Sequence, residues 1–334
     1  MKEVLVSINC ITYNHEKYIA QAIESFLMQK TNFEFEILIH DDASNDRTQE
    51  IIRGYERKFP NKIKAILRNE NQYSKGVKRI GYFNNHLRAK GKYIAWCEGD
   101  DYWTDSYKLQ KQVDYMEKND ECMLVFHNAE KISDLSKKSE GYMIPLNLES
   151  KRCSIKDILE LRFIPTASVM YRKKSLDNPP EWYFNAIVGD LPGNLISISK
   201  GYAYYINECM SVYRVENMDS AVNQWSKSYN NIDNKIKHCQ DFLDIINNFD
   251  EYTNGKYADE IEDIRLYWLF HQEKYKGNIS ELKSEKFKNI YKDLTLKNKF
   301  IIYLIKISPN TYIKLCKLIF DIKNKMQKRC KNGK

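Results

Sequence analysis

The strongest constraint on the fold is a regular alternation of strand-like and helix-like segments over the first 130 residues. Apolar, β-branched runs alternate with segments whose apolar residues recur every three or four positions, as on the buried face of a helix. The strand-like runs are 4–12, 33–40, 62–69, 92–98 and 122–132, and the helix-like segments between them are 15–29, 43–60, 76–91 and 106–120. Such alternation predicts an α/β fold in which helices cover a three-layer, mostly parallel sheet.

The pattern changes twice later in the chain. Residues 131–160 are too polar for a core, whereas 163–173 and 202–215 again resemble strands and 184–201 reads as a loop entering a helix. Beyond residue 221, Asn and Lys dominate and strand signals vanish. A length of 334 residues suits two domains. We therefore predict one domain over 1–220 and a helical extension over 221–334.

Unusual residues follow three of the predicted strands. They are Thr12, Tyr13 and Asn14 after the first strand, Asp41 and Asp42 after the second, and Glu98, Asp100 and Asp101 after the fourth. In an open parallel sheet, ligands bind outside the carboxyl ends of the strands. The sequence therefore predicts that these acids and a tyrosine meet at one edge of the sheet.

Three acids on one tight turn repel one another unless a cation relieves them. Carboxylates suit a hard divalent cation such as Mg²⁺ or Mn²⁺, and Gly99 allows the backbone to turn sharply. The six histidines are dispersed, which argues against zinc. A solvated acidic turn without any ligand is the alternative.

A glycine-rich phosphate loop is absent from the sequence, since neither G-x-x-x-x-G-K nor G-x-G-x-x-G occurs. A nucleotide at this edge would depend on a metal for its phosphates and on side chains for its base. Tyr13 would stack on the base and Asp42 would accept a hydrogen bond from a ring N–H. Taken alone, a tyrosine such as Tyr13 is more often a core residue, and an aspartate such as Asp42 is more often a turn former.

The amino-terminal segment and the cysteines indicate a cytoplasmic protein. Glu3 precedes only a short apolar run, which is not a secretory signal, and no uncharged run reaches the ~18 residues of a spanning helix. The eight cysteines form no C-x-x-C pair. We expect them to be reduced and mostly buried rather than to bind zinc or form disulfides.

The positive charge of the chain lies in its last 39 residues. Residues 296–334 hold eleven Lys or Arg and one acid, whereas the rest of the chain holds 42 basic and 44 acidic residues. An apolar helical stripe runs through this tail with lysines off it; its members are Tyr312, Leu315, Cys316, Ile319, Ile322 and Met326. A basic amphipathic helix suits an anionic membrane surface. Packing of the stripe on the body of the protein, with solvated lysines, is the alternative.

Four segments taken together are more specific than any one of them. In order they read "CITYNHEKYIAQAIESFLMQ", "ILIHDDASNDRTQEII", "GKYIAWCEGDDYWTDSYKLQKQ" and "VGDLPGNL". Over roughly residues 3–215 the chain resembles the family 2 glycosyltransferases, which have the A-type glycosyltransferase fold. The resemblance implies a nucleotide-sugar donor, Mn²⁺ or Mg²⁺ as cofactor, and inversion at the anomeric carbon.

The resemblance also implies roles for individual residues. Tyr13, flanked by Thr12 and Asn14, would bind the nucleotide base together with Asp41 and Asp42. "E-G-D" stands where the family has D-x-D, so Asp100 would bind the metal, and Glu98 or Asp101 would serve the ribose or support the metal. The remaining roles are the catalytic base for Asp190 and a contact with the diphosphate for Arg214, with Lys78 and Arg79 as weaker phosphate candidates.

Two of these roles have structural alternatives. Asp190 precedes Pro192 and would otherwise be a helix cap. Arg214 would otherwise be a surface or ion-paired residue, and the histidine that often follows it in related sequences is missing here.

The leading hypothesis is an inverting glycosyltransferase that uses a nucleotide-diphosphate sugar, UDP-linked by preference. The acceptor would be a glycan or a polyprenyl-linked glycan in surface polysaccharide synthesis, reached at the cytoplasmic face of the membrane. The alternative is a non-catalytic scaffold or sensor that binds nucleotide sugars on the same fold. Nucleic acid is not an expected partner, because the body of the protein is slightly acidic and contains no recognisable nucleic-acid module.

Overall fold

The computed structural model describes residues 3–161, 163–215 and 231–318. The chain divides into two compact units, one made of the residues up to 132 with 138–215, the other of 133–137 with the residues after 215. The predicted domain boundary near 220 falls within 216–230, outside the described residues, and stays a prediction.

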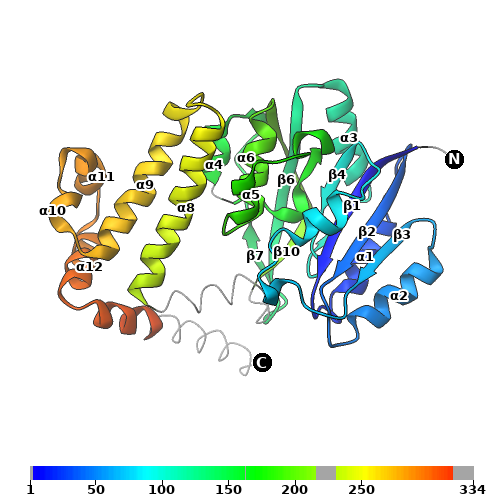
Figure 1. Cartoon of the computed structure of the whole chain (residues 1–334), viewed down its shortest axis with the longest axis horizontal. Helices are drawn as coiled ribbons and strands as arrows, with labels where there is room; N and C mark the ends of the chain where they lie inside the picture. Colours follow the sequence, from blue (N-terminus) through cyan, green and yellow to red (C-terminus); the bar gives the residue numbers. More distant parts are fainter. Residues whose placement is uncertain (1–2, 162, 216–230, 319–334) are drawn as a thin grey trace. The chain divides into compact units, whose positions relative to one another are not determined.

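The first unit is built on one ten-stranded sheet (Figure 1). Eight of its strands follow the order β3-β2-β1-β4-β9-β6-β10-β5, and the other two, β7 and β8, pair with β6 and β10. The strands are β1 (Val4–Thr12), β2 (Glu34–Asp41), β3 (Ile63–Leu67), β4 (Tyr93–Trp96), β5 (Tyr102–Trp103), β6 (Cys122–Ser133), β7 (Ser139–Tyr142), β8 (Lys151–Cys153), β9 (Met170–Arg172) and β10 (Tyr202–Val215). Strands β1 to β4 pair in parallel, whereas β5, β7, β8 and β9 pair antiparallel. The predicted α/β class is confirmed, but the sheet is mixed rather than mostly parallel, because only β1 to β4 pair in parallel and the later strands return antiparallel beside them.

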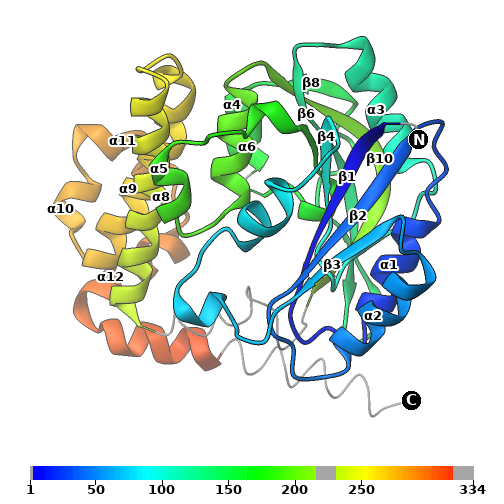
Figure 2. The same ribbon diagram turned by 45° about the vertical axis from the view of Figure 1, so that its right-hand side comes forward.

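Helices lie on both sides of the sheet; Figure 2 shows α1 and α2 on one side of β1 to β3 and α4 and α6 on the other. The helices of this unit are α1 (Ile19–Leu27), α2 (Thr48–Lys58), α3 (Lys108–Lys118), α4 (Ile155–Leu161), α5 (Glu181–Asn185) and α6 (Asp190–Ile198), with short turns η1 (Tyr73–Lys75), η2 (Tyr82–His86), η3 (Thr166–Ser168) and η4 (Lys173–Ser175). Alternate residues of β1, namely Val6, Ile8 and Cys10, join α1, α2 and α3 in the main core. This alternation follows from the two-residue period of a strand.

The opposite face of β1 carries two buried polar residues, Ser7 and Asn9. The Asn9 side chain donates a hydrogen bond to the Gly81 carbonyl at 3.1 Å, and Asn85 donates to Asn9 Oδ1 at 2.8 Å and to the Leu38 carbonyl at 3.1 Å. Buried amides are costly unless they are bonded in this way. The bonds therefore fix η2, a short π-helix, against β1 and β2.

The predicted helix over 76–91 is wrong in extent, because helical structure covers only residues 80–86. The preceding residues are held by Asp42, whose carboxylate accepts hydrogen bonds from the backbone N–H groups of Gln72 and Tyr73 at 2.9 and 3.0 Å. Arg79 has a φ of 56°, in the left-handed region that an α-helix cannot continue through. Long-range contacts thus override the local helical pattern.

The second unit is mainly helical over residues 231–318. Its elements are α8 (Ile232–Tyr252), α9 (Ala258–Lys276), α10 (Ile279–Leu282), η5 (Glu285–Phe287), α11 (Lys288–Lys292) and α12 (Leu296–Ile307), and residues 309–318 are also helical. The unit has a core of its own, formed by Phe270, Ile279, Leu282, Phe287 and Ile302. None of the helices in the described part of the chain is long and apolar enough to cross a bilayer. Of the predicted tail stripe, Ile319, Ile322 and Met326 lie outside the described residues.

Candidate functional site

The carboxyl ends of β1 and β2 and the turn after β4 meet at Thr12. The Thr12 carbonyl accepts a hydrogen bond from the Asp42 N–H at 3.0 Å, and the Ile11 carbonyl accepts one from the Gly99 N–H at 2.9 Å. A Cβ atom at Gly99 would lie only 2.6 Å from Thr12 Oγ1. Glycine is therefore required at this position by the close approach of the two backbones.

The turn after β4 carries three carboxylates of different exposure. The Asp100 side chain is 15% exposed, whereas Asp101 is buried. Burial, together with the charges of the Asp100 and Asp190 carboxylates, raises the pKa of Glu98 to about 8. Burial and the Asp100 charge also raise the pKa of Asp101 well above its usual range, against the opposing effect of the Arg214 N–H bond. Ionisation of all three carboxylates at once is therefore unfavourable unless a cation offsets their charge.

Asp190, the first residue of α6, lies near this turn although it is distant in the sequence. Its charge contributes to the raised pKa of Glu98, and burial raises the pKa of Asp190 itself. One oxygen of Asp190 accepts a hydrogen bond from the Leu191 N–H at 2.8 Å. Asp190 is therefore not the N-cap of α6, which is Gly189, although its carboxylate bonds an N–H of the first turn and also shares the electrostatic environment of the acidic turn.

Tyr213, on β10, is a further residue near these carboxylates, and the sequence analysis did not identify it. Burial raises the pKa of its hydroxyl, and four carboxylates add to this effect, those of Asp101, Glu98, Asp100 and Asp190. The Tyr213 hydroxyl therefore lies within electrostatic range of all four carboxylates. No local signal in "SVYRV" distinguishes Tyr213 from any other strand tyrosine.

Arg79 fixes the loop that leads to Asp190. Its guanidinium donates hydrogen bonds to the carbonyls of Tyr183, Ala186 and Val188 at 2.8, 2.6 and 2.5 Å. The neighbouring Lys78 donates to the Asn185 carbonyl at 2.7 Å. Both cations, which the sequence offered as weak phosphate candidates, are engaged with backbone carbonyls of one loop.

Arg214 is likewise engaged within the protein. Its N–H donates to Asp101 Oδ1 at 2.8 Å, and its guanidinium donates to the Asp100 carbonyl and to the Gln21 side chain. The guanidinium carbon lies 4.9 Å from the centre of the Tyr18 ring and 4.7 Å from that of Tyr102. Arg214 therefore ties the acidic turn to α1 and β10.

The residues predicted for the nucleotide base divide into two groups. Asp41 accepts hydrogen bonds from the Ser44 N–H at 2.9 Å and from the Gln49 side chain at 2.6 Å. Asp42 accepts the hydrogen bonds from the backbone N–H groups of residues 72 and 73 that are described above. Asn14 Oδ1 accepts from the Asn45 N–H at 2.9 Å. These three side chains shape loops at the rim, whereas Tyr13 is 43% exposed and presents an aromatic ring.

Several polar atoms at the rim would suit a cation. Thr12 Oγ1, Asp101 Oδ2 and His15 Nδ1 are buried without a hydrogen-bond partner in the described residues. His15, which sequence reasoning overlooked, has its Nε2 3.8 Å from Asp100 Oδ2. The oxygen-rich donors fit Mg²⁺ or Mn²⁺. However, no three His, Cys, Asp or Glu side chains of residues 3–161, 163–215 and 231–318 are arranged to hold a metal ion. Further oxygens, such as those of a phosphate, would be needed to complete the coordination.

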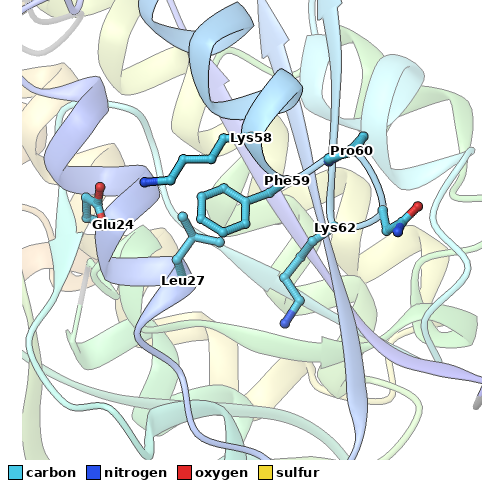
Figure 3. A pocket seen from close by; sticks show the side chains of 7 residues that line it. Glu24, Leu27, Lys58, Phe59, Pro60 and Lys62 are labelled. Carbon is cyan, nitrogen blue, oxygen red and sulfur yellow. The ribbon is translucent and has the colours of Figure 1, made fainter.

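A surface pocket of about 430 Å³ lies elsewhere, between α1 and the end of α2 (Figure 3). Its lining residues are Glu24, Leu27, Lys58, Phe59, Pro60, Asn61 and Lys62. Because α1 and α2 run back from the carboxyl ends of the strands, this pocket lies at the opposite edge of the sheet. It contains no predicted site residue.

Curated proteins resemble part of the chain in sequence. The chain is 38% identical over 220 residues to the uncharacterised protein Rv1520 of Mycobacterium tuberculosis, covering 63% of this chain and 58% of that protein. The chain thus spans little more than half the length of this relative. It is 41% identical over 116 residues to the Escherichia coli protein WfaP, a UDP-Glc:α-D-GlcNAc-diphosphoundecaprenol β-1,3-glucosyltransferase, covering 34% of this chain and 41% of WfaP.

Solved structures share the fold at low sequence identity. Staphylococcus aureus TarS in complex with UDP-GlcNAc has a TM-score of 0.56 and 14% identity, over 93% of this chain and 89% of that one. The mannosyltransferase PcManGT of Pyrobaculum calidifontis, in complex with GDP-Man and Mn²⁺, has a TM-score of 0.54 and 11% identity, over 94% and 85%. The predicted A-type glycosyltransferase fold is confirmed.

The predicted family is also confirmed. The sequence profile described as glycosyl transferase family 2 matches residues 7–178, which is more than half of the chain. The chain therefore belongs to glycosyl transferase family 2.

Proposed function

We propose that the protein transfers a sugar, with inversion, from a nucleotide-diphosphate sugar to a glycan or polyprenyl-linked acceptor in surface polysaccharide synthesis. One observation carries the proposal: the pKa of Glu98 is raised by both Asp100 and Asp190, acids that lie about ninety residues apart in the sequence. A metal-binding carboxylate and a catalytic base must share one site, and the effect of both acids on Glu98 supports these roles for Asp100 and Asp190.

In the proposed reaction Asp190 acts as the general base. A sugar hydroxyl is a weak nucleophile, so Asp190 takes its proton while the oxygen bonds to the anomeric carbon. The bond from that carbon to the diphosphate breaks, and its electron pair leaves with the nucleotide diphosphate. Attack from the face opposite the leaving group inverts the anomeric configuration. Burial raises the pKa of Asp190, which makes the carboxylate a stronger base.

The donor would lie along the rim of the sheet. Tyr13 would stack on the base, while Thr12, Asn14, Asp41 and Asp42 would shape the base pocket. Glu98 would contact the ribose or the metal shell, and Asp100 and Asp101 would hold Mn²⁺ or Mg²⁺, which when bound would offset the charge of the departing diphosphate. Arg214 would act here chiefly by holding the turn, since its guanidinium already donates to the Asp100 carbonyl.

UDP is the favoured nucleotide and a lipid-linked glycan the favoured acceptor. The names of TarS and WfaP support this choice, because the first is bound to UDP-GlcNAc and the second uses UDP-Glc with a diphosphoundecaprenol acceptor. Because PcManGT is bound to GDP-Man, GDP-sugars should also be assayed as donors.

Asp190→Asn is expected to remove the general base and leave the donor site intact. The purified chain should release UDP from one member of a panel of UDP-, GDP- and dTDP-sugars in the presence of Mn²⁺ and acceptor. The variant should lose at least about 100-fold in kcat, since general base catalysis contributes roughly 10²–10⁴-fold. UDP binding, measured by calorimetry, should stay within twofold of that of the unchanged protein.

The same experiment separates the enzyme from the alternative of a nucleotide-sugar sensor. A sensor would bind one donor and release no nucleotide with any acceptor extract, before or after the Asp190→Asn change. Mass spectrometry of the product and NMR of its anomeric proton would identify the sugar and test inversion. Retention of configuration would contradict the proposed role of Asp190.

A further inference from the structure

The helix α12 of the second unit carries an exposed apolar ridge. Leu296, Phe300 and Ile307 are 86%, 65% and 80% exposed, and Tyr303 lies between them with 41% exposed. Their spacing of four, three and four residues places all four on one side of the helix. Ile302 and Ile305, on the other side, are buried. The helix is therefore anchored by one face and presents a second apolar face outward.

Lysines flank this ridge and acids are absent from it. Residues 296–318 contain Lys297, Lys299, Lys306, Lys314 and Lys317 and no Asp or Glu. At 100° per residue, Lys297 lies on one side of the ridge, and Lys299 and Lys306 lie on the other. Leu315 and Leu318, in the helical residues that follow α12, are exposed as well.

We infer that the α12 ridge is a docking surface for an anionic lipid bilayer. An apolar strip between lysines matches the two layers of a membrane surface: the strip enters the acyl boundary, and the lysines meet the anionic headgroups. None of the described helices is able to span a bilayer, so α12 would lie in the plane of the surface.

Charge argues against two other occupants of the ridge. In a symmetric dimer the same patch would face itself, which would bring the lysines of both copies together. The tail of the chain, residues 319–334, holds six Lys or Arg and one acid, so it too repels this surface. A bilayer rich in anionic lipid is the partner whose charge is complementary.

The inference is independent of the proposed transfer reaction, and its test measures binding alone. The full chain should sediment with vesicles of phosphatidylglycerol and phosphatidylcholine at low salt and stay in solution with phosphatidylcholine alone. Phe300→Ser combined with Ile307→Ser should lower the partition coefficient at least about tenfold, since both side chains lose most of their insertion surface. Both positions are exposed, so the fold should be retained, which circular dichroism would verify.

Matched variants make the test decisive. Leu146→Ser, at a residue of the first unit that is 59% exposed, should leave vesicle binding unchanged. Phe300→Trp should shift its fluorescence to the blue on adding anionic vesicles, whereas Leu146→Trp should not. Equal binding by the double serine variant, or a Phe300→Trp spectrum that does not move, would overturn the inference. So would a dimer, seen in sedimentation velocity without lipid, that the double variant dissociates.

Discussion

Lys108 is fully buried at the start of α3. Its ammonium donates to Gln112 Oε1 at 2.8 Å and lies 4.1 Å from the centre of the Trp103 ring. No carboxylate among the described residues forms an ion pair with it, and burial lowers the pKa of the amine from 10.5 to about 7. A buried cation of this kind reduces stability while it stays protonated.

Lys108→Met should therefore stabilise the first unit below pH 7. Because the folded pKa of Lys108 lies below the unfolded one, its destabilising effect is complete below about pH 7 and disappears as the pH rises through 10.5. Over that window the advantage of the variant should shrink by about 1.4 kcal/mol per pH unit. Urea unfolding from pH 6 to 10 would measure it, with the exposed Lys118→Met as control. An advantage that does not change with pH would contradict the pKa assigned here.

Arg79 is expected to act through the position of Asp190. Arg79→Ala removes three hydrogen bonds to the loop before Asp190, and a misplaced base costs about 100-fold when it moves by roughly 1 Å. We expect kcat to fall 10- to 100-fold with UDP affinity unchanged, and Arg79→Lys to recover part of the loss. The exposed Arg53→Ala is the control. A loss of UDP affinity at unchanged kcat would instead indicate that Arg79 contacts the phosphates of the donor, the role that the sequence analysis considered for it.

The turn after β4 is the element on which the site depends. Its acids are presented by a backbone that passes so close to Thr12 that only glycine fits at position 99. The carbonyl of Asp100 and the carboxylate of Asp101 are both bonded to Arg214. The turn is thus clamped from β1 on one side and from β10 on the other.

Gly99→Ala should displace this turn and lower kcat by at least tenfold, because a Cβ atom would lie 2.6 Å from Thr12 Oγ1. Gly54→Ala is the matched control, since nothing lies within 4 Å of its added Cβ atom in α2. That variant should gain about 0.5–1 kcal/mol of stability and keep full activity. Thermal melts together with initial rates would measure both effects, and full activity of Gly99→Ala would show that the turn tolerates movement.

Elements whose signal is local were predictable from the sequence. The runs that became β1, β2 and β4 are short and apolar, and the segments that follow these strands meet near Thr12, as the rule for parallel strands requires. The segment 76–91 has a helical pattern as well, but Asp42 binds the backbone of residues 72 and 73, and the helix starts only at 80. The position of Tyr213 near the acids and the antiparallel pairing of β9 depend on contacts between residues far apart in the sequence. A local sequence pattern does not indicate such contacts.

At the scale of the whole molecule, the two units have separate hydrophobic cores. One core joins β1, β2 and β4 to three helices, and the other is formed by residues between 270 and 302. Units with cores of their own commonly unfold in separate transitions. The proposed donor site lies entirely in the first unit.

Calorimetry should therefore record two transitions, and UDP should raise the midpoint of only one. Ligand binding stabilises the unit that holds the ligand by mass action. Phe270→Ala should lower the midpoint of the other transition, because emptying a core position reduces the free energy of unfolding by about 3–5 kcal/mol. Asp190→Asn, in the first unit, serves as the control, because it should leave the transition of the second unit unchanged. A single transition moved by both UDP and Phe270→Ala would mean that the units unfold together.

The bonds from Arg214 to the acidic turn have a practical consequence for anyone who shortens this chain. The family profile stops at residue 178, yet Asp190, Tyr213 and Arg214 all come after it. A fragment trimmed to the recognisable family region would keep the "EGDDYW" letters and lose the strand that holds them in shape. The smallest piece worth expressing for enzymology ends no earlier than Val215, the last residue of β10.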